Sequence, residues 1–315
     1  MNLKDLIIEE NEHFIAINKP QGLVVNRSET QKEETLQDLV ENYLVDNKIT
    51  GYKDNRQNKE PQLASYPDIS VSKEIQGEFQ VRSGIVHRLD KDTSGVVLVA
   101  KTPQAFAELK NLFLNRKIKK SYYAVVFGDV TSVFQGYPYL KVDLPLARNP
   151  RNRMKYAVVE GGREAVSYVY IANPNQIFHF ADSPFEDKDK KITGYKDIKR
   201  SKDKRYKYSL SSYPDISSSN NSVTEYDGYK FSFLHIKPKT GRTHQIRVHL
   251  KALNHEILGD RIYEGRKQKE FSQKHNISLM LHARSLRFSA FGKKFCMRAG
   301  FPKEFVNAVK ELWDG

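Results

Sequence analysis

Residues 84–101 read GIVHRLDKDTSGVVLVAK, and this stretch says most about the fold. Two apolar runs, residues 85–86 and 96–100, enclose a polar turn that begins at Asp90. Short apolar runs bounded by turn residues are typical of buried strands. The sequence therefore predicts a loop from Asp90 to Gly95 that is pinned between two core strands.

Patterns on both sides of this stretch predict further strands and helices. Residues 6–25 are expected to form paired strands around a turn at 20–22, and residues 35–45 a helix. Thr102 should cap a helix that starts at Pro103. The other expected elements are strands at 121–128, 164–171 and 230–236, a helix from a Thr243 cap to about Leu253, a hairpin at 279–297 around Gly292, and a helix at 302–312. No regular βαβ repeat connects them, so the predicted fold class is α+β.

Two polar segments, at about 46–80 and 183–228, interrupt this pattern and resemble each other. The motif ITGYKD occurs at 49–54 and 192–197, and SYPDIS at 65–70 and 212–217. Two separated copies cannot stack into a solenoid, and long loop insertions cost little closure entropy. We interpret them as surface insertions in a single domain spanning 1–315. The alternative is an arm that contacts RNA or a partner, because residues 188–208 are basic and contain tyrosines.

The composition favours a negatively charged partner. The 315 residues include 52 Lys and Arg against 38 Asp and Glu, a net charge of +14. Such a field attracts polyanions, because each neutralised phosphate releases a condensed counterion. By charge alone, a merely basic soluble protein is an equal alternative.

The chain shows no sign of export or membrane insertion. Its single cysteine, Cys296, allows no internal disulfide and suits a reducing compartment. No apolar run approaches the roughly 20 residues of a membrane span, and the first residues lack a secretory signal pattern. We expect a cytoplasmic protein that does not bind membranes.

The first place suited to chemistry is the polar turn itself. Asp90 follows His87 and Arg88 and precedes Thr93. An aspartate on a loop held by strands can act as a nucleophile or a base. It must stay ionised while partly buried, which requires a nearby cation or several hydrogen-bond donors. The simpler interpretation of any such aspartate is a turn or cap residue.

Two other places offer cations and aromatic rings. Residues 241–249, GRTHQIRVH, include Arg242, His244, Gln245 and Arg247 near an expected helix start. The strand at 120–125 carries Tyr122, whose ring could stack on a base.

Several other chemistries lack their signatures. His244 and His249 have neither a cysteine cluster nor the His-Glu-x-x-His spacing of a zinc site. Residues 92–94 differ from an aspartic protease loop, because the glycine is displaced and there is no second copy. Neither a P-loop nor a Gly-x-Gly-x-x-Gly motif occurs. The residues by themselves thus indicate an α+β enzyme or binding protein, for RNA, with a candidate Asp–Arg site.

Six blocks, in order along the chain, resemble the RluA-like family of RNA pseudouridine synthases. They are INKPQGL (17–23), GIVHRLDKDTSG (84–95), KSYYAVVFG (120–128), GRTHQIRVHL (241–250), GDRIY (259–263) and LHA (281–283). The resemblance covers nearly the whole chain except the two polar segments. It implies a mixed, mostly antiparallel sheet flanked by helices, with a basic central cleft, that isomerises uridines in tRNA or rRNA without cofactor or metal.

The resemblance also implies roles for individual residues. Asp90 matches the nucleophile that attacks a flipped-out uridine, Tyr122 the tyrosine that packs on the base, and Arg247 the arginine that pairs with the aspartate. Arg242 is the less favoured candidate for that pairing. Arg88 is expected to fill the space left by the extruded base or to hold a phosphate. The expected substrate-binding residues are His87, Arg88, Thr93, Arg242, His244 and Gln245.

Some expectations concern what the chain lacks, and two other functions stay open. The opening strand near Leu6 leaves no room for a small N-terminal RNA-binding domain, and we expect a monomer without an obligate protein partner. Asn254-His255-Glu256 replaces the Gly-His-Pro common in the family, at a turn. The alternatives are an RNA-binding protein without catalysis and a glycosidic hydrolase. The hydrolase would pair Asp90 with a second carboxylate within about 5–10 Å, for which Asp260 is the candidate.

Overall fold

The computed structural model describes residues 1–29, 31–47, 71–175, 177, 196–200, 206–209 and 222–314. The described chain divides into two compact units: unit 1 comprises Met1–Lys120 and Ala283–Gly300, and unit 2 comprises Ser121–His282 and Phe301–Gly315. The repeated motifs at 49–54, 65–70 and 212–217, and most of the motif at 192–197, lie outside the described residues. Within the described part, none of the helices has both the length and the apolarity to cross a bilayer.

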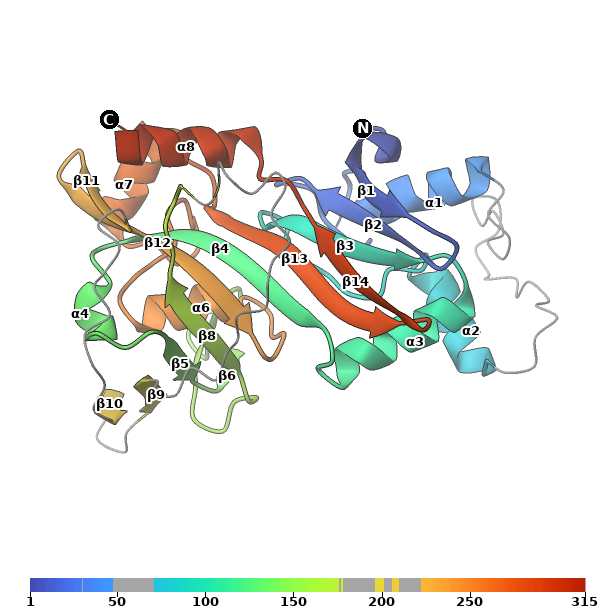
Figure 1. Cartoon of the computed structure of the whole chain (residues 1–315), viewed down its shortest axis with the longest axis horizontal. Coiled ribbons are helices and arrows are strands. Elements are labelled where there is room, and N and C mark those ends of the chain that lie inside the picture. The colour runs from blue at the N-terminus through green and yellow to red at the C-terminus, as the bar shows by residue number, and fades with distance from the viewer. Residues whose placement is uncertain are drawn as a thin grey trace. The chain divides into compact units, whose positions relative to one another are not determined.

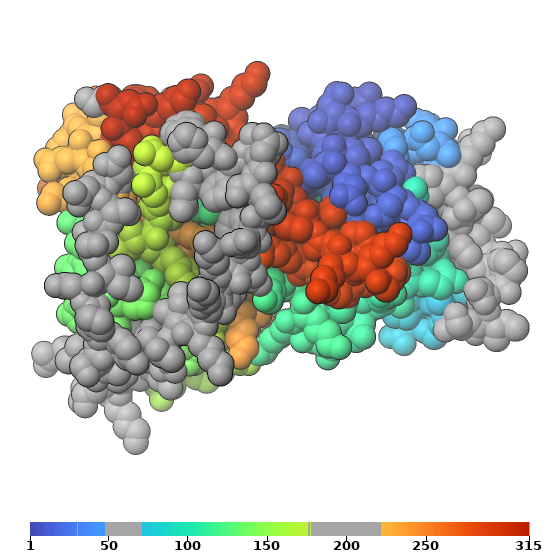
Figure 2. Space-filling model, viewed as in Figure 1, coloured from blue at the N-terminus to red at the C-terminus, as the bar shows by residue number. Residues whose placement is uncertain are grey.

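Unit 1 is built on a sheet with the strand order β1-β2-β3-β13, and β14 pairs with β13 (Figure 1). Its elements are the 3-10 helix η1 (Leu3–Leu6), β1 (Ile7–Glu10), β2 (Phe14–Lys19), α1 (Leu36–Asp46), α2 (Lys73–Val81), β3 (Ser94–Ala100), α3 (Pro103–Leu114), β13 (Leu281–Ala290, in this unit from Ala283) and β14 (Lys293–Arg298). β2 pairs antiparallel with both β1 and β3, and β13 with β14. On one face of the unit, the β14 hairpin (orange-red) lies against the N-terminal strands (blue), as Figure 2 shows.

The core of unit 1 forms where α3 packs on this sheet. β3 is buried along its whole length, and Phe106 and Leu109 of α3 join Leu98 in one apolar cluster. The Thr102 side chain accepts the Ala105 N–H, with Pro103 in the first turn, which confirms the predicted cap. The strand that carries the polar turn is therefore the most deeply buried of this unit's sheet.

Unit 2 is built on a second set of strands, in the order β4-β12-β8-β5-β9-β10, with β11 beside β12. Its elements are β4 (Lys119–Phe127, in this unit from Ser121), α4 (Thr131–Phe134), β5 (Leu140–Asp143), β6 (Leu146–Arg148), β7 (Tyr156–Val158), β8 (Val166–Ile171), β9 (Lys196–Arg200), β10 (Tyr206–Ser209), β11 (Val223–Tyr226), β12 (Tyr229–Pro238), α6 (Gln245–Ala252), α7 (Arg266–Lys274) and α8 (Lys303–Asp314). β5 and β9 pair in parallel, whereas β12 pairs antiparallel with β4, β8 and β11. β6 and β7 form a separate antiparallel hairpin.

Helices α6 and α8 supply much of the core of unit 2. Ile246 and Leu250 of α6 and Phe305 and Val309 of α8 join one apolar cluster with the buried residues of β4 and β12. These positions follow the helical spacing that the sequence shows. Both units thus combine a mostly antiparallel sheet with packed helices, which confirms the α+β fold class.

Several sequence-based expectations were wrong in detail. Residues 20–25 form no strand; instead, β1 pairs with β2 around residues 11–13. The carbonyls of Val24 and Val25 accept the first two N–H groups of α1, so this segment caps a helix. The first polar segment also stops short of residue 80, because Ser72 caps α2, which buries Phe79.

The predicted loop and helix starts needed two further corrections. Residues 85–86 make no strand: Ile85 forms only an isolated bridge to Val99, after a turn with positive φ at Ser83 and Gly84. Thr243 does not cap α6; His244 stands at the N-cap, in the left-handed region at φ 55°. The single domain over 1–315 and the basic central cleft stay predictions.

Candidate active site

In unit 1 the segment 84–94 runs back along β3 from the last residues of that strand and then turns into its start. The Ala100 N–H donates to the Gly84 carbonyl at 2.8 Å, and the Thr93 N–H donates to the Asp90 carbonyl at 3.1 Å. Gly95, the second residue of β3, has φ +122°, and a Cβ there would lie 2.1 Å from the Ala283 carbonyl oxygen. Only glycine fits this close approach, so the backbone after Asp90 is fixed by packing against β13.

The buried side chain of Lys19 anchors this turn. Its side chain is fully buried, and Nζ donates to the carbonyls of Pro20 (2.8 Å), Leu23 (2.9 Å) and Lys91 (2.9 Å). Burial lowers the pKa of the Lys19 amine to about 7, while the charges of Asp92 and Asp90 raise it. Three carbonyl acceptors require three N–H donors, which only the ammonium form supplies. The charged amine therefore ties the turn to the 19–23 loop.

His87 holds the other side of the turn. Its Nε2 accepts the Leu98 N–H at 3.0 Å, and its ring stacks on Phe113 with centroids 4.4 Å apart. Burial lowers the pKa of the His87 imidazole to about 3, and the charges of Lys120 and Arg82 act in the same direction. The ring is thus neutral, with its proton on Nδ1. This geometry favours a structural role for His87 over the predicted contact with substrate.

The remaining predicted residues of the turn differ in exposure. Asp90 is half-buried, Arg88 is exposed, and Thr93 is buried. An exposed arginine next to a half-buried aspartate keeps the turn accessible from solvent, whereas Thr93 belongs to its packed side. The structure therefore groups all four predicted residues of unit 1 on one turn.

In unit 2, Gln245 fixes the start of α6. Its Oε1 accepts from Thr240 Oγ1 (2.7 Å) and the Arg242 N–H (3.0 Å), and its Nε2 donates to the Val166 carbonyl (2.9 Å) and to Ser167 Oγ (3.0 Å). A buried amide with this many internal bonds has little capacity left for a substrate. Gln245 accordingly joins the 240–245 turn to β8.

Arg247, the third residue of α6, forms a buried ion pair with Asp260. Arg247 Nε and Nη2 donate to the Asp260 carboxylate at 2.8 and 2.7 Å, and both side chains are almost fully buried. Asp260 Oδ1 also accepts the backbone N–H groups of Ile262 (3.1 Å) and Tyr263 (3.2 Å). Such charge-assisted fork geometry fixes a guanidinium in place. With this many bonds Asp260 is a supporting carboxylate, which removes the best candidate for the second acid of a hydrolase.

The other polar residues of this segment also have bonds within unit 2. Arg242 Nε donates to the Glu164 carbonyl at 3.0 Å, and His244 Nδ1 lies 2.9 Å from the Tyr263 hydroxyl. His249 is fully buried between Ser167 Oγ and the Leu144 carbonyl. Burial lowers the pKa of the His249 imidazole to about 4 despite its bond to that carbonyl. His244 and His249 therefore both have hydrogen-bond partners within unit 2. Among the described residues, no three or more metal-ligating side chains form a cluster.

Tyr122 lies on β4, opposite Ile236 of β12 in register. Because side chains alternate along a strand, Tyr122 and Tyr123 point to opposite faces. Tyr123 is buried and stacks on Phe233 and His235, whereas Tyr122 is half-exposed. The strand thus buries one ring in the core and leaves its neighbour a partly accessible face.

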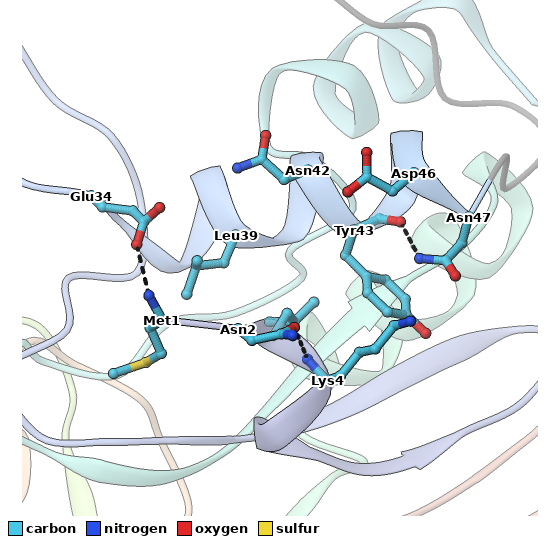
Figure 3. Close-up of a pocket in the computed structure, with 10 residues that line it drawn as sticks. Met1, Asn2, Lys4, Glu34, Leu39, Asn42, Tyr43, Asp46 and Asn47 are labelled. Carbon is cyan, nitrogen blue, oxygen red and sulfur yellow. Dashed lines mark hydrogen bonds and ion pairs between the residues drawn. The ribbon is translucent and has the colours of Figure 1, made fainter.

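A pocket of about 500 Å³ in unit 1 contains none of the predicted site residues. It lies between η1 and α1, where the Met1 amino group faces Glu34 and the Asn47 side chain bonds the Tyr43 carbonyl (Figure 3). Polar and apolar atoms share its lining equally, and none of the lining residues belongs to the predicted site. The turn of unit 1 and the α6 region of unit 2 remain the candidates for the site.

Comparison with known proteins identifies the family. A family model described as RNA pseudouridylate synthase matches residues 13–252, which include the turn at Asp90, Tyr122 and Arg247. The chain belongs to the RNA pseudouridylate synthase family. As a pseudouridine synthase it is an isomerase that converts uridine in RNA to pseudouridine.

Relatives of this pseudouridine synthase cover almost its full length. It is 28% identical over 97% of its length to a ribosomal large subunit pseudouridine synthase D of Zymomonas mobilis, of which it spans 72%. It is 29% identical over 97% to the Borreliella burgdorferi protein of the same name, of which it spans 68%. The solved structure of human RNA pseudouridylate synthase domain containing 1 has a TM-score of 0.57 at 18% identity, covering 96% of this chain and 85% of that one. The structural likeness supports the fold.

Sequence reasoning missed two supporting residues of the synthase. The opening motif includes Lys19 without giving it a role, although a lysine at the end of the apolar strand β2 is a signal of a buried charge. The sequence suggests for Asp260 only the part of a second acid in a hydrolase. Its partner Arg247 lies 13 positions away, and no local pattern pairs the two.

Proposed function

We propose that this pseudouridine synthase modifies uridine in the RNA of the large ribosomal subunit, with Asp90 as nucleophile. The observation that carries the proposal is the turn at Asp90, which combines the family motif with a half-buried carboxylate on a backbone fixed by Lys19 and Gly95. The ribosomal substrate is inferred from two relatives that align with 97% of the chain and are named for the large subunit.

In the proposed reaction the target uridine is swung out of its RNA, at a cost of a few kcal/mol. Asp90 attacks the ribose C1′ as the bond from C1′ to N1 breaks. The freed base turns, and its C5 bonds to C1′ while the bond from Asp90 to C1′ breaks and returns the carboxylate. The hydrogen on C5 leaves as a proton and N1 gains one, so atoms balance without a redox carrier, metal or cofactor. Tyr122 packs on the neutral base, and Arg247, whose guanidinium is held by Asp260, is the third catalytic residue of the proposal.

Exposed cations of unit 2 support RNA as the partner. The segment between β6 and β7, residues 149–155, and its flanks carry Arg148, Arg151 and Arg153, all exposed, and the half-exposed Lys155. Exposed arginines gathered on one hairpin suit phosphate contacts, which position the RNA without reading its sequence. In the proposal these phosphate contacts offset the free-energy cost of extruding the base.

The proposal also places the enzyme in the cytoplasm, as a monomer without an obligate partner protein.

The test is release of tritium from transcripts that carry uridine labelled at C5. Large-subunit ribosomal RNA and unmodified tRNA are compared, with the wild-type enzyme beside Asp90→Asn. We expect release from the ribosomal transcript by the wild type and none by the variant. Release by Asp90→Asn would refute the nucleophile assignment, and release from tRNA alone would refute the ribosomal substrate.

Arg88 has a narrower part in the proposal. It is exposed beside Asp90, where a guanidinium can occupy the space of an extruded base or hold a phosphate. Arg88→Ala should weaken RNA binding and slow turnover. Wild-type values for both quantities would remove Arg88 from the site.

A further inference from the structure

The Tyr263 hydroxyl joins two segments of unit 2 that are far apart in sequence. The backbone N–H of Tyr156, at the start of β7, donates to this hydroxyl at 2.9 Å, and His244 Nδ1 lies 2.9 Å from the same oxygen. Tyr263 is buried, in an apolar cluster with Leu146 and Val248. One hydroxyl therefore links the β6–β7 hairpin to the start of α6.

The ring of Tyr263 contacts the same helix at Arg247. The Arg247 guanidinium carbon lies 5.2 Å from the ring centroid, within the range of a cation–π contact. The carboxylate that pairs with Arg247 belongs to Asp260, three residues before Tyr263, and it accepts the Tyr263 N–H. The turn at 260–263 thus holds the guanidinium by a carboxylate and a ring together.

The basic loop, residues 149–155, is tied to this cluster through Tyr156. The Arg148 guanidinium lies 5.4 Å from the Tyr156 ring centroid, and its Nη1 donates to the Arg153 carbonyl at 2.8 Å. The Arg148 side chain therefore joins the loop to the residue whose N–H the Tyr263 hydroxyl accepts.

We propose that Tyr263 is a positioning residue that couples the basic loop to Arg247. Phosphates bound by the loop are then held at a fixed place relative to the arginine of the site. This inference rests on the proposed function, since it requires that the loop bind RNA. Neither the hydroxyl nor the ring of Tyr263 needs to contact the substrate for this role.

The test is a double-mutant cycle on RNA binding, with Tyr263→Phe and Arg153→Ala alone and together. Tyr263→Phe keeps the buried ring beside Arg247 and removes the hydroxyl that holds Tyr156. Binding to a large-subunit ribosomal transcript is measured as a function of salt. The matched control is Tyr226→Phe, which also removes a tyrosine hydroxyl of unit 2, one that bonds Glu311 on the surface.

In the wild-type background, Arg153→Ala should weaken RNA binding by about threefold or more. It should also reduce the steepness of log K (the association constant) against log salt concentration by up to about 0.9, the value for one phosphate. Tyr263→Phe should lower the same slope, and in its background Arg153→Ala should have less than half its effect. Tyr226→Phe should change neither quantity.

Each other outcome has a separate meaning. If Arg153→Ala weakens binding equally in both backgrounds, the coupling through Tyr263 is refuted while the loop still binds RNA. Arg153→Ala could instead leave RNA affinity and its salt slope unchanged, although the wild type binds RNA and releases tritium. The loop then does not contact RNA, and the coupling inference is refuted while the proposed isomerisation stands. A general loss of folding in Tyr263→Phe would reduce the fraction of active protein and leave the salt slope of that fraction unchanged, which also refutes the coupling.

Discussion

Replacing Asp260 by asparagine should destabilise unit 2 strongly, because Asp260 neutralises a buried guanidinium. Asparagine keeps an oxygen for the N–H groups of Ile262 and Tyr263, but it loses the charge and one of the two bonds to Arg247. The Arg247 side chain is 4% exposed and the Asp260 side chain 0%. Breaking a buried pair from one side costs about 3–5 kcal/mol, and we expect about 3 kcal/mol for this nearly isosteric change.

The assay is urea denaturation followed by the fluorescence of Trp313, the single tryptophan of the chain. Trp313 packs on the core of unit 2, with its ring 6.3 Å from Phe233, so it reports the unit in which the pair lies. The control is Glu270→Gln, which breaks an ion pair with Arg266. In that pair the Glu270 side chain is 60% exposed and the Arg266 side chain 92%. That variant should stay within about 0.5 kcal/mol of the wild type.

A second variant separates charge burial from general damage. Arg247→Met combined with Asp260→Asn removes the unpaired charge, and replacing a buried pair by neutral groups of similar size is close to neutral. The double variant should therefore be more stable than Asp260→Asn alone, although it should be inactive in tritium release. The reasoning is refuted if Asp260→Asn costs less than about 1 kcal/mol, a value expected for an ordinary substitution, or if adding Arg247→Met does not restore stability.

Two further predictions concern the backbone and a buried histidine. Gly95→Ala should lower the free energy of unfolding by about 3 kcal/mol or more, since its Cβ would lie 2.1 Å from the Ala283 carbonyl oxygen at φ +122°. Gly292→Ala, with open space at φ +71°, should lower it by about 1 kcal/mol. Equal shifts of the urea midpoint for the two variants, followed by circular dichroism, would contradict this. Burial lowers the pKa of His249 from 6.5 to about 4, so the unfolded chain takes up a proton that the folded one refuses, and stability falls as the pH drops from 6.5 to 4. At pH 5.5 the loss should be about 1 kcal/mol, and it should be missing from the profile of stability against pH of His249→Gln. Parallel profiles of unfolding free energy for the two proteins would show that His249 does not titrate this way.

The local elements of the fold followed from the sequence because their causes are local. The Thr102-Pro103 start of α3, the α1 stretch and the hairpin around Gly292 are set by caps, spacing and turn residues within a few positions. Where the residues of a segment suited two different local structures, the prediction was wrong. Residues 20–25 carry strand-like residues, but their carbonyls serve the start of α1.

The candidate site divides in the same way. The motif at 84–95 identified Asp90 and the family without any coordinates, because the turn and the residues that define it are contiguous. The substrate-binding roles of His87 and Gln245 stay predictions, and the structure adds that each forms hydrogen bonds with residues outside its own motif. A motif shows which residues occur together, but it cannot show which of them face inward.

The sequence by itself determined the fold class, the family and the position of the turn that carries Asp90, all of which depend on residues close together in the chain. Only the tertiary structure decided what holds these residues in place. Lys19 bonds a carbonyl 72 positions away, and the Tyr263 hydroxyl accepts an N–H 107 positions away. The physical reason is that a buried charge or hydroxyl must find partners wherever the fold brings donors and acceptors, and separation along the chain does not restrict where those partners lie.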